Sequence, residues 1–242
     1  MPSRAAPQIT PPEAPQHPNP RLPLIRRILK PVLAAYMRPY HHLRLEGAEH
    51  VPASGPLLVV LNHASLLDVP ALMVVDPFPN TATVVKASMF GIPVIGWILH
   101  QWGAIPVERE GRDSSSIRRM LAVLRGGGVL AVAAEGRRTR SGRLEPINPV
   151  LARIAATAGV PVLPVGLVGS FKALPPGAIL PRPVQIIVRA GPPFDLRRDM
   201  DPAEATERIR REIAALLPPE QQPLEGDRPP HPPSPPPSFS RE

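Results

Sequence analysis

The sequence predicts a single α/β domain with a mixed, mostly parallel central sheet covered by helices, preceded by a basic amphipathic helical segment and flanked by disordered, Pro-rich tails. Short apolar runs recur through the middle of the 242-residue chain, and helical patterns lie between them, an order typical of a sheet covered by helices. Prolines concentrate at the ends: of 38, eight fall within residues 1–23 and ten within residues 218–242. We therefore divide the chain into a tail (1–22), an amphipathic segment (23–45), a domain (46–217) and a second tail (218–242).

The two tails carry few large apolar side chains, so they cannot offset the entropy cost of ordering. The run PPHPPSPPPS favours polyproline II. A ligand for a proline-binding module is the alternative to a solvated tail. The N-terminus lacks the apolar region of a secretory signal, and no stretch of 18 uncharged apolar residues predicts a transmembrane helix.

The segment 23–45 is basic and amphipathic, and it contains no acid. On a helix, Arg26, Arg27 and Lys30 fall opposite an apolar face. That face comprises positions 24, 25, 28, 29, 32, 33 and 36. The pattern suits a helix lying in an anionic membrane interface; the alternative is a surface helix whose apolar stripe packs on the domain. Pro31 is expected to interrupt or bend this helix near Lys30.

Six apolar runs predict strands. They read as continuous rather than alternating, as expected when helices cover both faces of a sheet. The runs are LLVVL (57–61), ATVV (82–85), AIPV (104–107), VLAVAA (129–134), PVLPVGLV (161–168) and VQIIVRA (184–190).

Three helices are predicted between and after these runs. Residues 116–125 place apolar side chains on one face and arginines on the other, and the triple glycine that follows ends the helix. Residues 149–158 begin with Pro149 in the first turn. The last helix has Asp201 as its N-cap and Pro202 as its first residue.

Composition narrows the possible functions. Cysteine is absent, which excludes disulfides, thiolate metal sites and a cysteine nucleophile. The net charge is +8, and 25 of the 28 basic residues are arginine, which favours phosphate and acidic lipid surfaces. Aromatic residues make up only 4%, too few to suggest stacking on single-stranded nucleic acid. A second apolar segment, 89–103, contains Trp97 and Trp102, which lie either at a lipid headgroup boundary or in the core.

The motif NHASLLD (62–68) follows the first predicted strand and carries the chemistry. His63 and Asp68 are five residues apart, across a strand end and a helix start. A carboxylate folded back onto one ring nitrogen would fix the tautomer and leave the other nitrogen free to take a proton from a hydroxyl. The alternative is that Asn62 or Ser65 caps a helix while His63 is merely exposed.

Arginines follow two other predicted strands. GAIPVER (103–109) places Arg109 after one, and EGRRTRSGR (135–143) places four arginines after another. Ligands bind at the carboxyl ends of strands in such sheets, so these groups could converge with His63. No G-x-S-x-G elbow and no histidine cluster with metal spacing occurs. A base beside arginines therefore indicates a phosphate-bearing substrate that presents a hydroxyl; the alternative for 135–143 is a solvated basic loop.

Four blocks in order resemble the glycerolipid acyltransferases, the 1-acylglycerol-3-phosphate O-acyltransferase group, from about Leu43 to Gly191. The first, with its His-four-residues-Asp motif, is LRLEGAEHVPASGPLLVVLNHASLLD. The second is KASMFGIPVIGWILHQWGAIPVER, which ends in the family's phosphate-contacting arginine, here Arg109. The third is AAEGRRTRSGR, similar to the Glu-Gly-Thr-Arg block, and the fourth is GVPVLPVGLVG, which the family ties to acyl binding or packing.

The resemblance implies that His63 is the general base, that Asp68 orients it, and that no metal or cofactor is needed. The lysophospholipid alkoxide would attack the thioester of acyl-CoA or acyl-carrier protein. Implied substrate-binding residues are Gly103, Arg109, Glu135, Gly136, Arg137 and Arg138. The expected partners are the lysophospholipid, the acyl thioester (including acyl-carrier protein) and an anionic membrane surface, with no nucleic acid. The expected location is peripheral, on the cytoplasmic face of a membrane.

The sequence departs from the family pattern around the third block. Ala133-Ala134 replaces Phe-Pro, Arg137 replaces Thr, and the usual Phe-Lys-x-Gly is Ile147-Asn148-Pro149-Val150. The added arginine either compensates for the lost lysine or signals a different headgroup. Acylation of a lyso-aminolipid or glycolipid is therefore one alternative, and a non-catalytic basic protein that binds membranes or nucleic acid is another.

Overall fold

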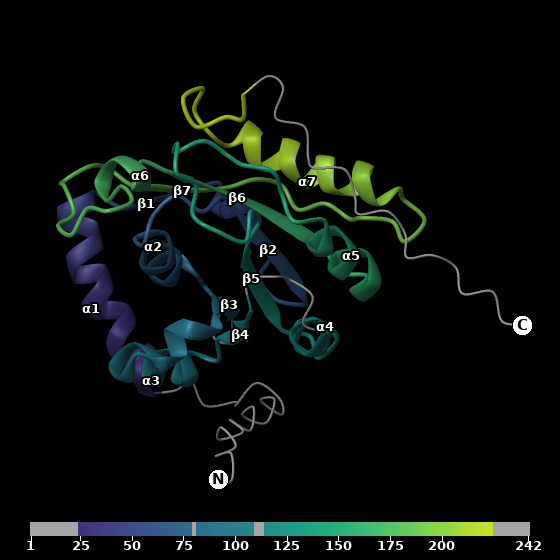
Figure 1. Cartoon of the computed structure of the whole chain (residues 1–242), viewed down its shortest axis with the longest axis horizontal. Helices are drawn as coiled ribbons and strands as arrows, with labels where there is room; N and C mark the ends of the chain where they lie inside the picture. Colours follow the sequence, from purple (N-terminus) through teal and green to yellow (C-terminus); the bar gives the residue numbers. More distant parts are fainter. Residues whose placement is uncertain (1–23, 79–80, 109–113, 225–242) are drawn as a thin grey trace, which may run out of the picture.

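A seven-stranded sheet ordered β1-β7-β6-β2-β5-β3-β4 forms the centre of the structure (Figure 1). This computed structural model describes residues 24–78, 81–108 and 114–224, so the predicted tail 1–22 and residues 225–242 lie outside the described part. The five strands from β6 to β4 run parallel, and β7 joins β6 antiparallel. The mostly parallel sheet is confirmed. The strands are β1 (Arg44–Glu46), β2 (Leu57–Leu61), β3 (Ala82–Lys86), β4 (Ile105–Val107), β5 (Val129–Ala133), β6 (Val162–Val168) and β7 (Ile187–Ala190).

Each of the six apolar runs forms a strand. All five residues of β2 are buried, because alternate side chains enter two separate cores, one on each face of the sheet. The seventh strand, β1, has only three residues and no apolar run to predict it. It is held at the sheet edge by parallel pairing with β7.

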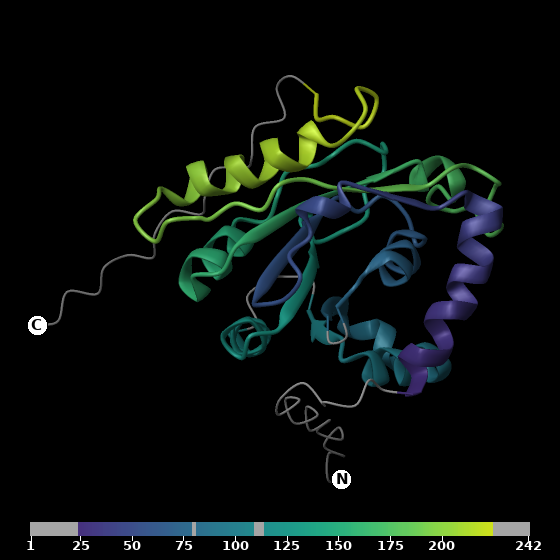
Figure 2. The same cartoon turned by 180° about the vertical axis from the view of Figure 1, so that it is seen from behind.

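Helices cover both faces of this sheet (Figures 1 and 2). Side chains of α4, α5 and α7 fill one core, and side chains of α1 and α2 fill the other. Asp201 caps α7 as predicted, since its carboxylate accepts from the N–H groups of Ala203 and Glu204. The helices are α1 (Leu24–His41), η1 (Ala48–His50), α2 (Asp68–Val75), η2 (Ala87–Gly91), α3 (Pro93–Trp102), α4 (Ser114–Arg125), α5 (Pro149–Ala158), α6 (Ser170–Ala173) and α7 (Pro202–Ala215).

Helix α1 differs from its prediction in two respects. It continues through Pro31, so of the predicted interruption or bend the interruption is wrong, and it ends at His41, before β1. Two of its four lysine and arginine side chains, those of Arg26 and Lys30, also face the protein. Arg26 is buried, its guanidinium donates to the carbonyls of Thr81 (2.6 Å) and Trp102 (2.5 Å) and lies over the Trp102 ring, and Lys30 donates to the carbonyl of Asp76 (2.5 Å).

The reason for this orientation is electrostatic. The carbonyls of Asp76 and Trp102 lie at the carboxyl ends of α2 and α3, where helical carbonyls have no partner within their helix and attract cations. With Arg26 and Lys30 holding α1 against these ends, part of its apolar stripe is turned outward: Ile28 is 53% exposed and Val32 58%. None of the helices in the described ranges has the length and apolar character needed to cross a bilayer.

The two tryptophans of the second apolar segment have different environments. Trp102 is 5% exposed and packs beneath the Arg26 guanidinium. Trp97, on the outer face of α3, is 56% exposed. Of the two environments considered from the sequence, the core position is confirmed for Trp102, whereas Trp97 is exposed.

Candidate active site

The candidate site forms where parallel strands end. Leu61 at the end of β2 pairs with Ala133 at the end of β5, so the segments that begin with Asn62 and Ala134 leave the sheet side by side. These segments carry His63 and Glu135. Strand β4 ends at the same edge, but Arg109, which follows it, lies outside the described residues.

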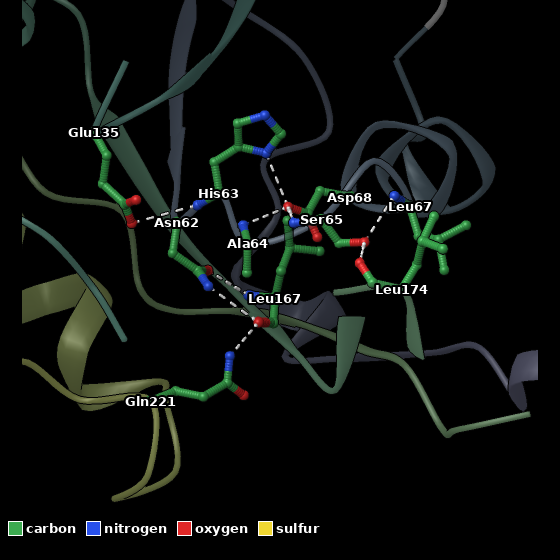
Figure 3. Close-up of polar contacts among 10 residues, drawn as sticks. All are labelled: Asn62, His63, Ala64, Ser65, Leu67, Asp68, Glu135, Leu167, Leu174 and Gln221. Atoms are coloured by element: carbon green, nitrogen blue, oxygen red, sulfur yellow. Dashed lines mark hydrogen bonds and ion pairs between the residues drawn. The ribbon is translucent and has the colours of Figure 1, made fainter. Parts of the chain in front are cut away.

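His63 and Asp68 form a hydrogen-bonded pair, with 2.9 Å between Nδ1 and Oδ2 (Figure 3). The same carboxylate oxygen accepts from the N–H groups of Ala64 (2.7 Å) and Ser65 (2.8 Å). Asp68 is fully buried as the first residue of α2, while the His63 side chain is 21% exposed. The carboxylate is thus fixed by the turn that it closes, and it orients a ring whose other nitrogen lies on the side away from Asp68.

The alternative in which Asn62 or Ser65 caps the helix differs from the structure, where Leu67 precedes α2 and no side chain caps that helix. Asn62 does not cap α2: its amide exchanges two hydrogen bonds with the backbone of Leu167, accepting at 2.7 Å and donating at 3.1 Å. Ser65 accepts from the N–H of Leu67 and donates to the carbonyl of Leu174. Asn62 therefore fixes the end of β2 to β6 directly before His63.

A residue from the predicted second tail also supports the site. Gln221 is 7% exposed, and its side-chain amide donates to the carbonyl of Leu167, the carbonyl that Asn62 also uses (Figure 3). Its own carbonyl accepts from the N–H of Leu144 in the arginine-rich loop at 2.8 Å. The prediction that residues from 218 onward are disordered is therefore wrong for 218–224. The high proline content of this region led to the prediction of disorder, and no sequence pattern around Gln221 indicated that its side chain is buried.

The loop after β5 lies against the histidine. The N–H of Thr139 donates to the carbonyl of His63 at 2.8 Å, so the loop brings Arg138, the residue before Thr139, to the segment that carries His63. Arg138 is exposed, and Arg137 pairs with Glu145 at 2.8 Å. Gly136 has a φ of 69°, a conformation that glycine adopts without strain, which allows the sharp turn out of β5.

Gly103 has a different position from these residues. It ends α3 with a φ of 74°, and its N–H donates to the carbonyl of His100. This is a glycine cap of a helix, directly before β4. Its direct role in the described structure is therefore to turn the chain toward the strand that leads to Arg109.

Glu135 is buried beside His63 and is only weakly hydrogen-bonded. The N–H of His63 donates to its Oε1 at 3.4 Å, and Oε2 has no partner in the described structure. Burial raises the pKa of Glu135 to about 9, and the nearby carboxylates of Glu145 and Asp68 add to this rise. At neutral pH this carboxyl is therefore protonated, so it does not repel an anion at the arginine-rich loop.

We expect Glu135→Gln to be more stable than the wild type at neutral pH, by a margin that grows as pH rises. The unfolded carboxyl loses its proton near pH 4.5 and the folded one near pH 9. Between these values the folded wild type binds one proton more than the unfolded chain, so its stability falls with rising pH. Glutamine does not titrate. Urea unfolding at about pH 5 and about pH 8 measures the margin, with the exposed Glu49→Gln as control; an equal margin at both pH values contradicts the assignment.

Comparison with known proteins places this geometry in context. A model of the family described as Acyltransferase matches residues 42–168. The chain is 33% identical over 143 residues to a chloroplastic 1-acyl-sn-glycerol-3-phosphate acyltransferase of Brassica napus, covering 58% of this chain and 41% of that protein. It is 33% identical over 113 residues to a lyso-ornithine lipid O-acyltransferase of Pseudomonas aeruginosa, covering 46% of this chain and 43% of that protein.

Among solved structures, the 1-acyl-sn-glycerophosphate acyltransferase PlsC from Thermotoga maritima matches with a TM-score of 0.68 at 23% identity, over 81% of this chain and 78% of that chain. The fold is therefore shared. The matched region spans only about two fifths of the length of the first two curated relatives, 41% and 40%.

Proposed function

The chain belongs to the Acyltransferase family, and from this premise we propose that it transfers a fatty acyl group from acyl-CoA or acyl-carrier protein to the free hydroxyl of 1-acylglycerol-3-phosphate, giving phosphatidic acid. The observation that carries the proposal is the His63–Asp68 pair, 2.9 Å apart at the carboxyl edge of the sheet. The names of the plant relatives support this acceptor.

In the proposed reaction His63 Nε2 takes the proton of the acceptor hydroxyl as its oxygen attacks the thioester carbonyl. Asp68 holds the ring through Nδ1 and stabilises the imidazolium that forms. Collapse of the tetrahedral intermediate breaks the carbon–sulfur bond, and the imidazolium returns its proton to the leaving thiolate. The histidine is regenerated, and the products are one new ester and one thiol.

The acceptor phosphate is assigned to the arginines at the same edge. Arg138 is exposed and precedes Thr139, which bonds to His63. Arg137 forms an ion pair with Glu145, so both arginines belong to the loop that contacts the His63 segment. Arg109 completes the set by its position after β4. Guanidinium groups bind phosphate through paired N–H donors, and a protonated Glu135 adds no negative charge beside them.

A lyso-aminolipid is a second candidate acceptor. Where the family has a lysine, this chain has Asn148, whose side chain caps α5 by accepting from the N–H of Val150 at 3.0 Å. One cation expected near the phosphate is thus replaced by a helix cap. The lyso-ornithine lipid O-acyltransferase among the relatives favours the same alternative.

The test is a competition between acceptors. The purified full chain is incubated with equal amounts of lysophosphatidate and lyso-ornithine lipid, once with acyl-CoA and once with acyl-carrier protein, and products are identified by mass spectrometry. We expect phosphatidate as the main product. Exclusive acylation of the lyso-ornithine lipid would transfer the proposal to the second candidate, and no product from any pair would refute acyl transfer.

We also propose that the enzyme works as a peripheral protein on the cytoplasmic face of an anionic membrane. Outward apolar side chains on α1 and α3 support this, among them Ile28, Val32 and Val94 (68% exposed). Trp97 lies on the same helix as Val94, and tryptophan is favoured at the headgroup level. The two helices pack against each other at one side of the molecule (Figures 1 and 2).

Replacing Val94 and Trp97 together by serine is expected to weaken binding to anionic vesicles by at least about tenfold, because two large apolar side chains no longer enter the interface. Cosedimentation with vesicles of phosphatidylglycerol and phosphatidylcholine measures this. Leu224→Ser, which removes an apolar side chain that is 57% exposed after α7, is the matched control. Unchanged binding of the double variant would remove α3 from the proposed surface.

A further inference from the structure

Ile179 and Leu180 are 91% and 79% exposed, more than any other large apolar side chain in the described residues. They follow α6 and lie at the tip of the segment that leads to β7. Neither takes part in the acyl-transfer site. Exposing two adjacent large aliphatic side chains to water is unfavourable, which makes this tip a candidate contact surface.

The loop that carries the tip, residues 174–183, contains a hydrogen-bonded turn. Pro175, Pro176 and Gly177 form a turn closed by the N–H of Ala178 on the carbonyl of Pro175, with Gly177 at a φ of 86°. Proline at the second position and glycine at positive φ at the third are what a type II turn requires. The apolar tip is therefore presented by a preorganised turn.

Two further hydrogen bonds fix the far side of the tip. Tyr40 at the end of α1 donates its hydroxyl to the carbonyl of Pro181 at 2.9 Å. The N–H of Arg182 donates to the carbonyl of Ala173 in α6 at 2.7 Å. The tip is thus attached to the carboxyl end of α1, and Figures 1 and 2 both show this loop against that end. Ile28 and Val32 lie in the first half of the same helix.

The loop is also joined to the catalytic segment. Ser65, two residues after His63, donates its hydroxyl to the carbonyl of Leu174, where the loop begins. Ile179 is the fifth residue after Leu174, so its backbone lies within about 18 Å of Leu174 even if the chain between them were fully extended. If the Ile179–Leu180 tip enters the headgroup region of a bilayer, this short distance keeps His63 close to the membrane surface. The hydroxyl of a lysolipid lies at about the same depth.

The charge around the tip fits an anionic lipid surface. No acidic residue occurs between Glu145 and Asp195. Arg182 in the loop and Arg38 near the end of α1 are both exposed. Apolar side chains flanked by arginines combine burial in the acyl boundary with attraction to anionic headgroups.

We propose that the Ile179–Leu180 tip is a second membrane contact, which inserts into an anionic bilayer beside the active site and sets the orientation of the catalytic edge on the membrane. This rests on the proposed function, since only an acceptor embedded in a bilayer requires such an orientation. The tip binds the lipid surface itself. This contact does not require Val94 and Trp97, which form the other proposed contact on α3.

A site-specific label tests the proposal directly. Because the chain has no cysteine, Leu180→Cys provides a unique position for an environment-sensitive fluorophore. Ala122→Cys, at an exposed position on α4, is the control on the side of the molecule away from α1 (Figure 1). Vesicles of phosphatidylglycerol and phosphatidylcholine should shift the emission of the Leu180→Cys label to shorter wavelength and leave the Ala122→Cys label unchanged.

The double variant Ile179→Ser/Leu180→Ser should reduce vesicle binding by at least about tenfold, while Leu224→Ser should not. Cosedimentation without an emission shift at position 180 would overturn the proposal. So would the same shift at high protein concentration without vesicles, which would show that the tip contacts a second copy of the chain. Neither measurement requires turnover, so failure of this proposal is distinct from failure to form phosphatidate.

Discussion

Replacement of His63 by alanine is expected to lower kcat for acyl transfer to lysophosphatidate by about 10²–10⁴-fold, the usual contribution of a positioned general base. The acceptor KM should change much less, because the phosphate is assigned to the arginines and not to the imidazole. Stability should change little as well, since the ring is partly exposed and bonded only to Asp68 among the described residues.

The control for this variant is His100→Ala, which removes an exposed histidine at the end of α3. Initial rates with acyl-CoA and lysophosphatidate, measured beside thermal unfolding of each variant, separate chemistry from folding. Equal rates for wild type and His63→Ala would show that another group takes the proton.

Asp68→Asn is expected to have an effect of similar size on kcat, about 10²–10⁴-fold, because a neutral amide neither fixes the tautomer nor stabilises the imidazolium. It should also cost about 1–3 kcal/mol of unfolding free energy. Asp68 Oδ2 accepts three hydrogen bonds, whereas Oδ1 is buried without a partner in the described structure. If the amide oxygen of the Asp68→Asn variant keeps those three hydrogen bonds, the NH2 group takes the place of Oδ1. That NH2 group is then buried without an acceptor, which destabilises the fold.

Kinetics and urea unfolding of Asp68→Asn provide both readouts, and Asp199→Asn, at an exposed carboxylate in the segment between β7 and α7, serves as control. Loss of stability with full kcat would make Asp68 a purely structural residue that closes the turn after β2.

The elements that sequence alone predicts are those governed by local rules. The apolar run 57–61 is β2, Pro149 starts α5, and Asp201 caps α7. The His63–Asp68 pair belongs with these, because five residues span a strand end and a helix start and the contact is made within one turn. Each depends on residues close in sequence, so periodicity and capping rules are sufficient.

What the sequence could not predict depends on distant backbone groups. Arg26 bonds carbonyls 55 and 76 residues away, which turns the basic side of α1 inward. Asn62 meets Leu167 across 105 residues, and Gln221 reaches the same carbonyl from a proline-rich segment. No pattern along the chain marks such partners, because any backbone carbonyl at a helix or strand end can fill the role.

In the proposed reaction the His63–Asp68 pair promotes direct transfer from the thioester to the lysolipid hydroxyl. The most direct measurement is mass spectrometry of both protein and lipid in one reaction, with isotopically labelled acyl-CoA added first and lysophosphatidate second. We expect an unmodified protein mass throughout and labelled phosphatidate only after the second addition. A protein that gains one acyl mass before the acceptor is added, or a wild type that forms no labelled phosphatidate, would rule out this direct transfer.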